Sequence, residues 1–193
     1  APTGTGKTLT PLGLSNDYKI IFVCVARHIG LALAKSAISM NKKIAFAFGC
    51  KTADNIRLHN FSVSEYVRND DGNYIKFKDG KKKIDHTNGS NVDIMICDVQ
   101  SYISAMYYML AFHDKNKIIM YWDEPTITLD HEKHELHNTI QKIWQENKIR
   151  NIIMSSATLP EIDKIQNVID TFKNKFDNSN VHYIRSYDFK KSI

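Results

Sequence analysis

The chain has 193 residues, of which 42% are hydrophobic and 24% are charged, a composition typical of one soluble globular domain with its own core. Its longest apolar run, over residues 20–26, is far too short to cross a bilayer, and no secretory signal pattern is present, so no membrane partner is expected. Three isolated cysteines, Cys24, Cys50 and Cys97, lack the spacing of a metal site and indicate an intracellular, reducing compartment.

Positive charge is concentrated in one half of the chain. The formal net charge is +5; residues 1–100 hold 14 Lys and Arg against 9 Asp and Glu, whereas residues 101–193 hold 12 of each kind. A basic half suits a polyanionic partner. A solvated, lysine-rich surface explains the same charge without a partner, and charge alone favours that interpretation.

The first expected element is a phosphate-binding loop at residues 1–8, Ala-Pro-Thr-Gly-Thr-Gly-Lys-Thr, with Ala1 where the general pattern has Gly. Its glycines let backbone N–H groups face phosphate oxygens, and a helix beginning near Lys7 would direct its positive dipole end at the same anion. Lys7 can reach the β- and γ-phosphates of a nucleotide, and the Thr8 hydroxyl can bind Mg²⁺. The residues expected to bind the nucleotide are Thr3, Gly4, Thr5, Gly6, Lys7 and Thr8.

Strand and helix patterns then alternate, which predicts an α/β fold with a mostly parallel sheet and helices on both faces. Continuous apolar runs are typical of strands buried on both faces, and helical spacing of apolar residues indicates the helices. The expected strands are 19–25, 43–48, 92–97, 117–122 and 150–154, with 181–185 as a candidate last strand, and the expected helices are 28–40, 100–112, 131–146 and 161–176.

Residues 51–91 interrupt this alternation, because they are polar and rich in Asn, Asp and Lys. Within them, residues 74–84 alternate around Asp79-Gly80, which is a hairpin pattern. We interpret 51–91 as an excursion from the sheet and not as a second domain.

The strand expected at 117–122 ends in Asp123-Glu124-Pro125-Thr126. A nucleotide hydrolase needs acids at such a strand end: Asp123 can hold the Mg²⁺ that bridges the phosphates, and Glu124 can orient and deprotonate the attacking water. An acidic helix cap would place acids there for structural reasons alone. The phosphate loop in the same chain favours the catalytic interpretation.

Hydroxyl residues follow the next strand, in Ser155-Ser156-Ala157-Thr158. They can hydrogen-bond to the acidic motif on the neighbouring strand. By itself this composition is also that of an ordinary loop.

Together the three motifs, at residues 1–8, 123–126 and 156–158, resemble those of the first RecA-like domain of a superfamily 2 helicase of the DEAD/DEAH type. The resemblance covers nearly the whole chain and implies a P-loop ATPase that uses ATP and Mg²⁺ to unwind nucleic acid or translocate on it. It implies catalytic roles for Lys7 and Glu124, and coupling to strand movement through Thr126, Ser156 and Thr158. The sequence as a whole also resembles helicase-like proteins of large DNA viruses.

The acidic motif departs from the family pattern, because Asp-Glu-Pro-Thr stands where the family has Asp-Glu-Ala-Asp or Asp-Glu-x-His. Thr126 can therefore take part in coupling only through a hydroxyl. The departure leaves the subfamily open.

Weaker matches imply contacts with the backbone of DNA or RNA. Arg27 follows the first predicted strand, where the family has a Pro-Thr-Arg motif, and Gly49 lies where the family often has glycines. Gln100 and Ser101 belong to Asp98-Val-Gln-Ser, where the family has Thr-Pro-Gly. The resemblance implies nucleic-acid contacts at these four residues.

The resemblance also implies a strand before the phosphate loop and a second RecA-like domain, whose arginines complete the ATP site. We therefore expect residues 1–193 to form one helicase ATP-binding domain, and to be inactive when isolated.

Other functions stay open. A motor that translocates on a duplex without unwinding it would carry the same motifs. A nucleotide-gated nucleic-acid-binding or structural protein without turnover belongs to a different class, and the presence of both Asp123 and Glu124 argues against it.

Two further patterns are assigned to structure. His131, His134 and His137 resemble a metal cluster, but their spacing is not that of a zinc protease, so a solvated helix face is favoured. The aromatic stretch at 102–112 suggests base stacking, yet burial, or a face covered by another domain, explains it better.

Overall fold

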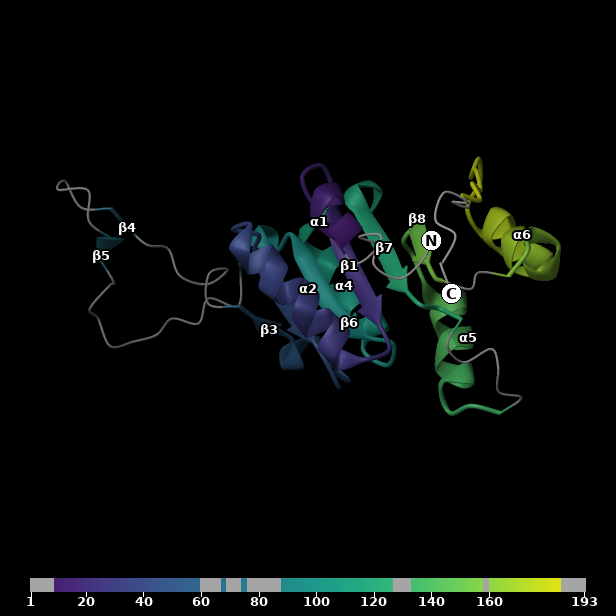
Figure 1. Ribbon diagram of the computed structural model, residues 1–193, viewed down its shortest axis with the longest axis horizontal. Coiled ribbons are helices and arrows are strands. Elements are labelled where there is room, and N and C mark those ends of the chain that lie inside the picture. The colour runs from purple at the N-terminus through teal and green to yellow at the C-terminus, as the bar shows by residue number, and fades with distance from the viewer. Residues whose placement is uncertain are drawn as a thin grey trace, which may run out of the picture.

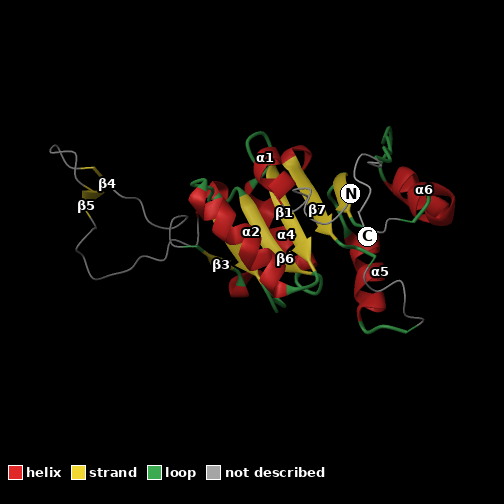
Figure 2. Cartoon of the chain, in the orientation of Figure 1, coloured by secondary structure: helices red, strands yellow, loops and turns green. Residues whose placement is uncertain are grey.

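The computed structural model describes residues 9–59, 67–68, 74–75, 88–126, 133–157 and 160–184. Its centre is a six-stranded sheet with the order β3-β2-β6-β1-β7-β8, in which every neighbouring pair is parallel except β2 and β3. Helices cover both faces of this sheet (Figure 1, Figure 2). The expected α/β class with a mostly parallel sheet is therefore confirmed.

The register of the strands aligns their carboxyl ends along one edge of the sheet. Cys24 pairs with Asp98, and Asp123 pairs with Ser155. The interior strands are almost wholly buried, because helices cover both faces, and this is why their sequences are continuous apolar runs. The strands are β1 Lys19–Cys24, β2 Ile44–Ala47, β3 Arg57–Leu58, β6 Ile94–Asp98, β7 Ile118–Asp123 and β8 Asn151–Ser155.

Two helices pack on each face of the sheet. α1 and α2 contact the face that carries Phe22 and Tyr121, whereas α4 and α5 contact the face that carries Met95 and Trp122. No described helix is both long and apolar enough to span a membrane. The helices are α1 Thr10–Leu14, α2 Arg27–Ser39, α4 Tyr102–Phe112, α5 Leu136–Glu146 and α6 Gln166–Lys175, and the short 3₁₀ turns are η2 Ala53–Asn55, η3 Asn88–Asn91, η4 Lys115–Lys117 and η5 Ile162–Ile165.

The aromatic helix α4 is buried along one side. Met106 and Met109 are fully buried, and so is Tyr102, whose hydroxyl donates to Asn147 Oδ1 at 2.5 Å. Burial raises the pKa of Tyr102 well above its ordinary value, so the hydroxyl keeps the proton that it donates. On the other side Tyr107 is exposed, and Lys148 Nζ lies 4.8 Å from the centre of its ring. Core packing thus accounts for the buried side of the aromatic stretch.

Three predicted segments differ from the structure. The helix expected at 131–146 begins at Leu136, because His134 Nδ1 accepts a hydrogen bond from Leu136 N and the chain turns there; residues 131–132 lie outside the described part. The helix expected at 161–176 begins as the 3₁₀ turn η5 and continues as α6. The candidate strand at 181–185 is not a strand over its described residues 181–184, because no described strand pairs with it.

Residues 51–91 were expected to leave the sheet, but β3 within them is still part of it. β3 adds an antiparallel strand to β2, and β4 Val67–Arg68 pairs antiparallel with β5 Tyr74–Ile75, away from the six-stranded sheet (Figure 1). The hairpin predicted over 74–84 differs, since Tyr74–Ile75 pairs with the preceding strand. The predicted turn at Asp79-Gly80 lies outside the described residues.

Candidate functional site

The carboxyl edge of the sheet gathers several residues that the motifs single out. Asp123 ends β7 and pairs with Ser155, the last residue of β8. Arg27 begins α2 just after β1, and Gly49 follows β2. In open α/β sheets, ligands bind outside this edge, so the strand order places the acidic motif and the predicted nucleic-acid contacts on one side of the molecule.

Asp123 lies on the face of the sheet that α1 covers. Side chains alternate along a strand, so Ile119, Tyr121 and Asp123 share a face, and the first two pack in one cluster with Leu12 of α1. The Asp123 side chain is nearly buried, at 6% exposure.

Tyr121 connects α1 to the same edge. The side chains of Ser155 and Thr10 lie within interaction distance of its hydroxyl. Burial raises the pKa of Tyr121 above its usual range, while these two side chains lower it. The neutral phenol therefore joins α1 to the end of β8, which sequence reasoning did not anticipate.

Glu124 is hydrogen-bonded to the segment that follows β8. Its N–H donates to Ser155 O at 2.7 Å, and its Oε2 accepts from Ser156 Oγ at 2.7 Å. Ala157 N donates to Oε1 at 3.1 Å and to Oε2 at 3.3 Å. The Thr126 and Ser156 hydroxyl oxygens are 2.9 Å apart. The acidic motif and the hydroxyl motif are thus in direct contact, and Ser156 joins Glu124 to Thr126.

Some predicted site residues lie outside the described part of the chain, and the roles assigned to them stay predictions. They are the nucleotide-binding residues Thr3, Gly4, Thr5, Gly6, Lys7 and Thr8, and the coupling residue Thr158.

The chemistry of Asp123 fits the Mg²⁺ that the resemblance implies. A hard cation prefers oxygen ligands, and Mg²⁺ commonly takes only one or two protein ligands beside phosphate and water. Asp123, a nearly buried carboxylate at the carboxyl end of β7, offers oxygen atoms of this kind. Among the described residues, no three His, Cys, Asp or Glu side chains gather to hold a metal ion, but a site of this kind does not need such a cluster.

The residues expected to contact nucleic acid differ in exposure. Arg27, Gly49 and Gln100 are exposed, and the Arg27 guanidinium lies 5.2 Å from the centre of the Phe48 ring. Ser101 is fully buried, and its hydroxyl accepts a hydrogen bond from Cys50 N at 2.8 Å. Contact between a phosphate and the Ser101 hydroxyl would therefore require the loop to open.

Asp98 is a further residue of this edge, and no motif in the sequence pointed to it. It ends β6, and its carboxylate accepts hydrogen bonds from Gly49 N and Ser101 N. An acid at the end of an apolar strand is the signal that pointed to Asp123, and the same signal is present at Asp98.

Cys24 lies behind the edge as a core residue. Burial raises the pKa of its thiol to about 12; the N–H of Gly30 lowers it, and the charges of Asp123 and Asp98 raise it further. A protonated, buried thiol is unreactive. Cys50 and Cys97 are likewise buried and free of disulfides.

His134 has a local structural role, since it accepts the hydrogen bond from Leu136 N at the start of α5. The centre of its ring lies 5.9 Å from that of His137. His131 lies outside the described residues.

A cavity of about 380 Å³ lies at the opposite end of the strands. Arg150, Asn151, Phe172 and Ser179 are among the residues that line it, and Asn151 is the first residue of β8. The cavity is therefore separate from the edge that holds Asp123 and Glu124.

Comparison of the chain with protein-family models and with curated proteins finds no match to either. The functional interpretation therefore rests on the three motifs and on the geometry of their described members.

Proposed function

We propose that the chain is the ATP-binding motor domain of a superfamily 2 helicase, and that it couples ATP hydrolysis to unwinding of nucleic acid or translocation on it. In this proposal residues 3–8 bind the phosphates, Thr8 and Asp123 hold Mg²⁺, and Glu124 activates water. A second RecA-like domain of the same protein completes the ATP site.

The contact between the acidic motif and the hydroxyl motif is the observation that carries the proposal. Asp123 pairs with Ser155 in register, and Glu124 is bonded to Ser156 and Ala157 through its carboxylate. These residues are about 30 positions apart in sequence, as the separations of 30 to 33 for their hydrogen bonds show. The pairing of β7 with β8 brings the segments that follow them together, and the Glu124 carboxylate meets the Ser156 hydroxyl and the Ala157 N–H there.

The geometry also suggests how the two motifs are coupled. A carboxylate has about four acceptor positions, and the Glu124 carboxylate accepts from two donors, the Ser156 hydroxyl and the Ala157 N–H, which is shared between its two oxygens. Donors of this kind stabilise the charged carboxylate and fix its direction. When bound, Mg²⁺ would neutralise charge on the phosphates. A shift of the segment after β8 would reorient Glu124. It would also move the Thr126 side chain, because Ser156 contacts both residues.

The test is nucleic-acid-stimulated release of phosphate from ATP by the full-length protein, with single-stranded and duplex DNA and RNA as stimulants. Lys7→Ala is expected to lose most of its affinity for a fluorescent ATP analogue, because the ammonium that contacts the phosphates is removed. Lys173→Ala removes an exposed ammonium from α6 and serves as the matched control. Equal affinity of Lys7→Ala and wild type would remove the phosphate site from the proposal.

Phosphate release, measured together with strand separation of a labelled duplex, separates the alternatives. Turnover with strand separation indicates a helicase, and turnover on duplex without separation indicates a translocating motor. ATP binding without turnover would indicate the nucleotide-gated binding or structural protein and overturn the proposal.

A further inference from the structure

Asp98 fastens two loops of the carboxyl edge to each other. Its Oδ2 accepts a hydrogen bond from Gly49 N, after β2, at 2.7 Å. Its Oδ1 accepts one from Ser101 N, before α4, at 2.8 Å. Both distances are short for N–H···O bonds, as expected for a charged acceptor. One carboxylate thus holds the loop after β2 against the first turn of α4.

Two hydroxyls extend this connection. Ser101 Oγ accepts from Cys50 N at 2.8 Å, and Ser104 Oγ donates to Lys51 O at 3.0 Å. Gly49 has φ of 66°, a left-handed conformation that favours glycine, so the loop turns sharply where it meets Asp98. We call this set of contacts the Asp98 clamp; it consists of Asp98, Ser101 and Ser104 with Gly49, Cys50 and Lys51.

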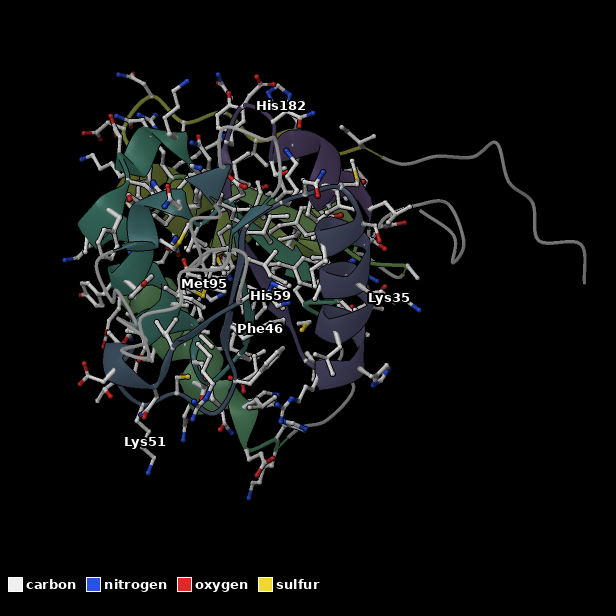
Figure 3. The ribbon with its side chains drawn as sticks, turned by 90° about the vertical axis from the view of Figure 1, so that its left-hand side faces the viewer. Lys35, Phe46, Lys51, His59, Met95 and His182 are labelled. Atoms are coloured by element: carbon white, nitrogen blue, oxygen red, sulfur yellow. The ribbon has the colours of Figure 1, made fainter. Side chains whose placement is uncertain are left out.

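The clamp leaves polar side chains exposed around it. The side chain of Lys51 points away from the fold (Figure 3), and Gln100 is exposed between Asp98 and Ser101. The Arg27 guanidinium lies over Phe48, the residue before Gly49. The N–H groups of Gly49 and Ser101 already donate to Asp98, so they are not free to donate to a phosphate. The exposed side chains of Lys51, Gln100 and Arg27 are the groups that can contact one.

We propose that Asp98 is a positioning residue for nucleic-acid binding. Through the clamp it fixes Lys51, Gln100 and the Phe48 ring, over which the Arg27 guanidinium lies. These side chains then face the sugar-phosphate backbone of one nucleic-acid strand. This inference rests on the proposed function. A carboxylate that acted only by its charge would repel phosphates, so neutralising it would tighten binding. A positioning role predicts the opposite sign.

The experiment measures binding of a fluorescently labelled single-stranded oligonucleotide to the full-length protein by anisotropy. Asp98→Asn replaces one acceptor oxygen by an NH₂ group that faces an N–H donor, which breaks one side of the clamp. We expect binding about tenfold weaker, the loss of one hydrogen bond to a charged group. Asp54→Asn, on the exposed turn η2 that follows the same loop, removes the same charge and is expected to bind as tightly as wild type or slightly more tightly.

A second variant keeps the charge of Asp98. Ser104→Ala removes only the bond to Lys51 O from an exposed contact, so it does not threaten folding, and we expect binding about threefold weaker. Affinity for the ATP analogue is expected to be unchanged in both variants, because β1 separates β6 from β7.

The outcomes distinguish failure of the positioning role of Asp98 from failure of the proposed function. If wild type binds and Asp98→Asn binds equally or more tightly, the positioning role is overturned and the proposed function stands. It is also overturned if Ser104→Ala binds as wild type does, or if Asp98→Asn loses ATP-analogue and oligonucleotide binding together, which indicates a general structural role. Absence of nucleic-acid binding by wild type overturns the proposed function and this inference with it.

Discussion

Glu124 combines a strained backbone with a carboxylate that accepts hydrogen bonds from Ser156 and Ala157. Its φ of 49° lies in the left-handed region, which costs a residue other than glycine about 1–2 kcal/mol. The bonds from Glu124 to Ser155, Ser156 and Ala157 hold it there. Strain that is maintained by surrounding contacts is common at functional sites. Glu124 is therefore the first residue to substitute in a test of the proposed ATP hydrolysis.

We expect Glu124→Gln to keep ATP binding and to lose hydrolysis. The amide preserves the size of the side chain but cannot accept the proton of the attacking water, and general-base catalysis contributes about 10²–10⁴-fold in rate. Phosphate release by the full-length protein in the presence of nucleic acid measures the loss. ATP-analogue binding, measured in parallel, is expected to stay close to that of wild type.

The control for this variant is Glu161→Gln, an exposed glutamate a few residues beyond Ala157. It makes the same chemical change on the segment after β8 and should leave turnover unchanged. A wild-type rate in Glu124→Gln would rule out Glu124 as the base and leave Asp123 without a catalytic partner.

Among single residues, Asp123 and Glu124 could be predicted as site residues from the sequence, because acids that follow a buried strand contrast with its apolar run. The role of Asp98 was not. Its partner Gly49 is 49 residues away, and their contact depends on β2 lying beside β6 in the sheet. Strand order is a property of the packed molecule, so a local pattern does not reveal it.

Among the elements, α2 is set closely against the sheet at Gly30. A Cβ placed there would lie 2.7 Å from Ile96 Cγ2, 2.9 Å from Phe48 Cζ and 3.1 Å from Cys24 Sγ. The first two distances are shorter than a carbon–carbon contact allows, and Ile96 is fully buried on β6. The absence of a side chain at Gly30 thus lets α2 approach β1 and β6.

We expect Gly30→Ala to lower the free energy of unfolding by about 1–3 kcal/mol, the usual cost of overpacking a core. Gly13→Ala, in α1, is the matched control, since no atom lies within 4 Å of its added Cβ. It should be neutral or stabilising by up to about 1 kcal/mol, because alanine favours a helix more than glycine does. Urea denaturation followed by circular dichroism measures both, and equal stability of the two variants would contradict the close packing of α2.

The elements differ in how well sequence predicted them. β1 and β7 were placed to within a residue, because burial on both faces leaves a continuous apolar run. β3 was missed, since its two residues pair only because β2 offers a free edge. The start of α5 was misplaced, because the turn at His134 comes from a side-chain bond and not from a change in hydrophobic spacing.

For the molecule as a whole, one edge of the sheet combines two kinds of charge. The acids Asp123 and Glu124 lie at the end of β7, beside the last residue of β8. Exposed cations lie around the loops of β1, β2 and β3, namely Arg27, Lys51 and Arg57. Part of the positive charge of residues 1–100 therefore lies at the carboxyl edge of the sheet.

Binding of single-stranded nucleic acid is accordingly expected to weaken with salt. Each phosphate neutralised by Lys or Arg releases counterions, with a slope of about −0.7 per contact in a plot of log affinity against log salt concentration. If Arg27, Lys51 and Arg57 each neutralise one phosphate, the slope should be about −2.

Anisotropy titrations of the full-length protein from about 50 to about 300 mM salt measure this slope. Arg27→Ala should bring the slope closer to zero by about 0.7, whereas Lys173→Ala, on α6, should leave it unchanged. A slope near zero in wild type would mean that this edge does not contact the backbone, and that the basic half of the chain is only a solvated surface.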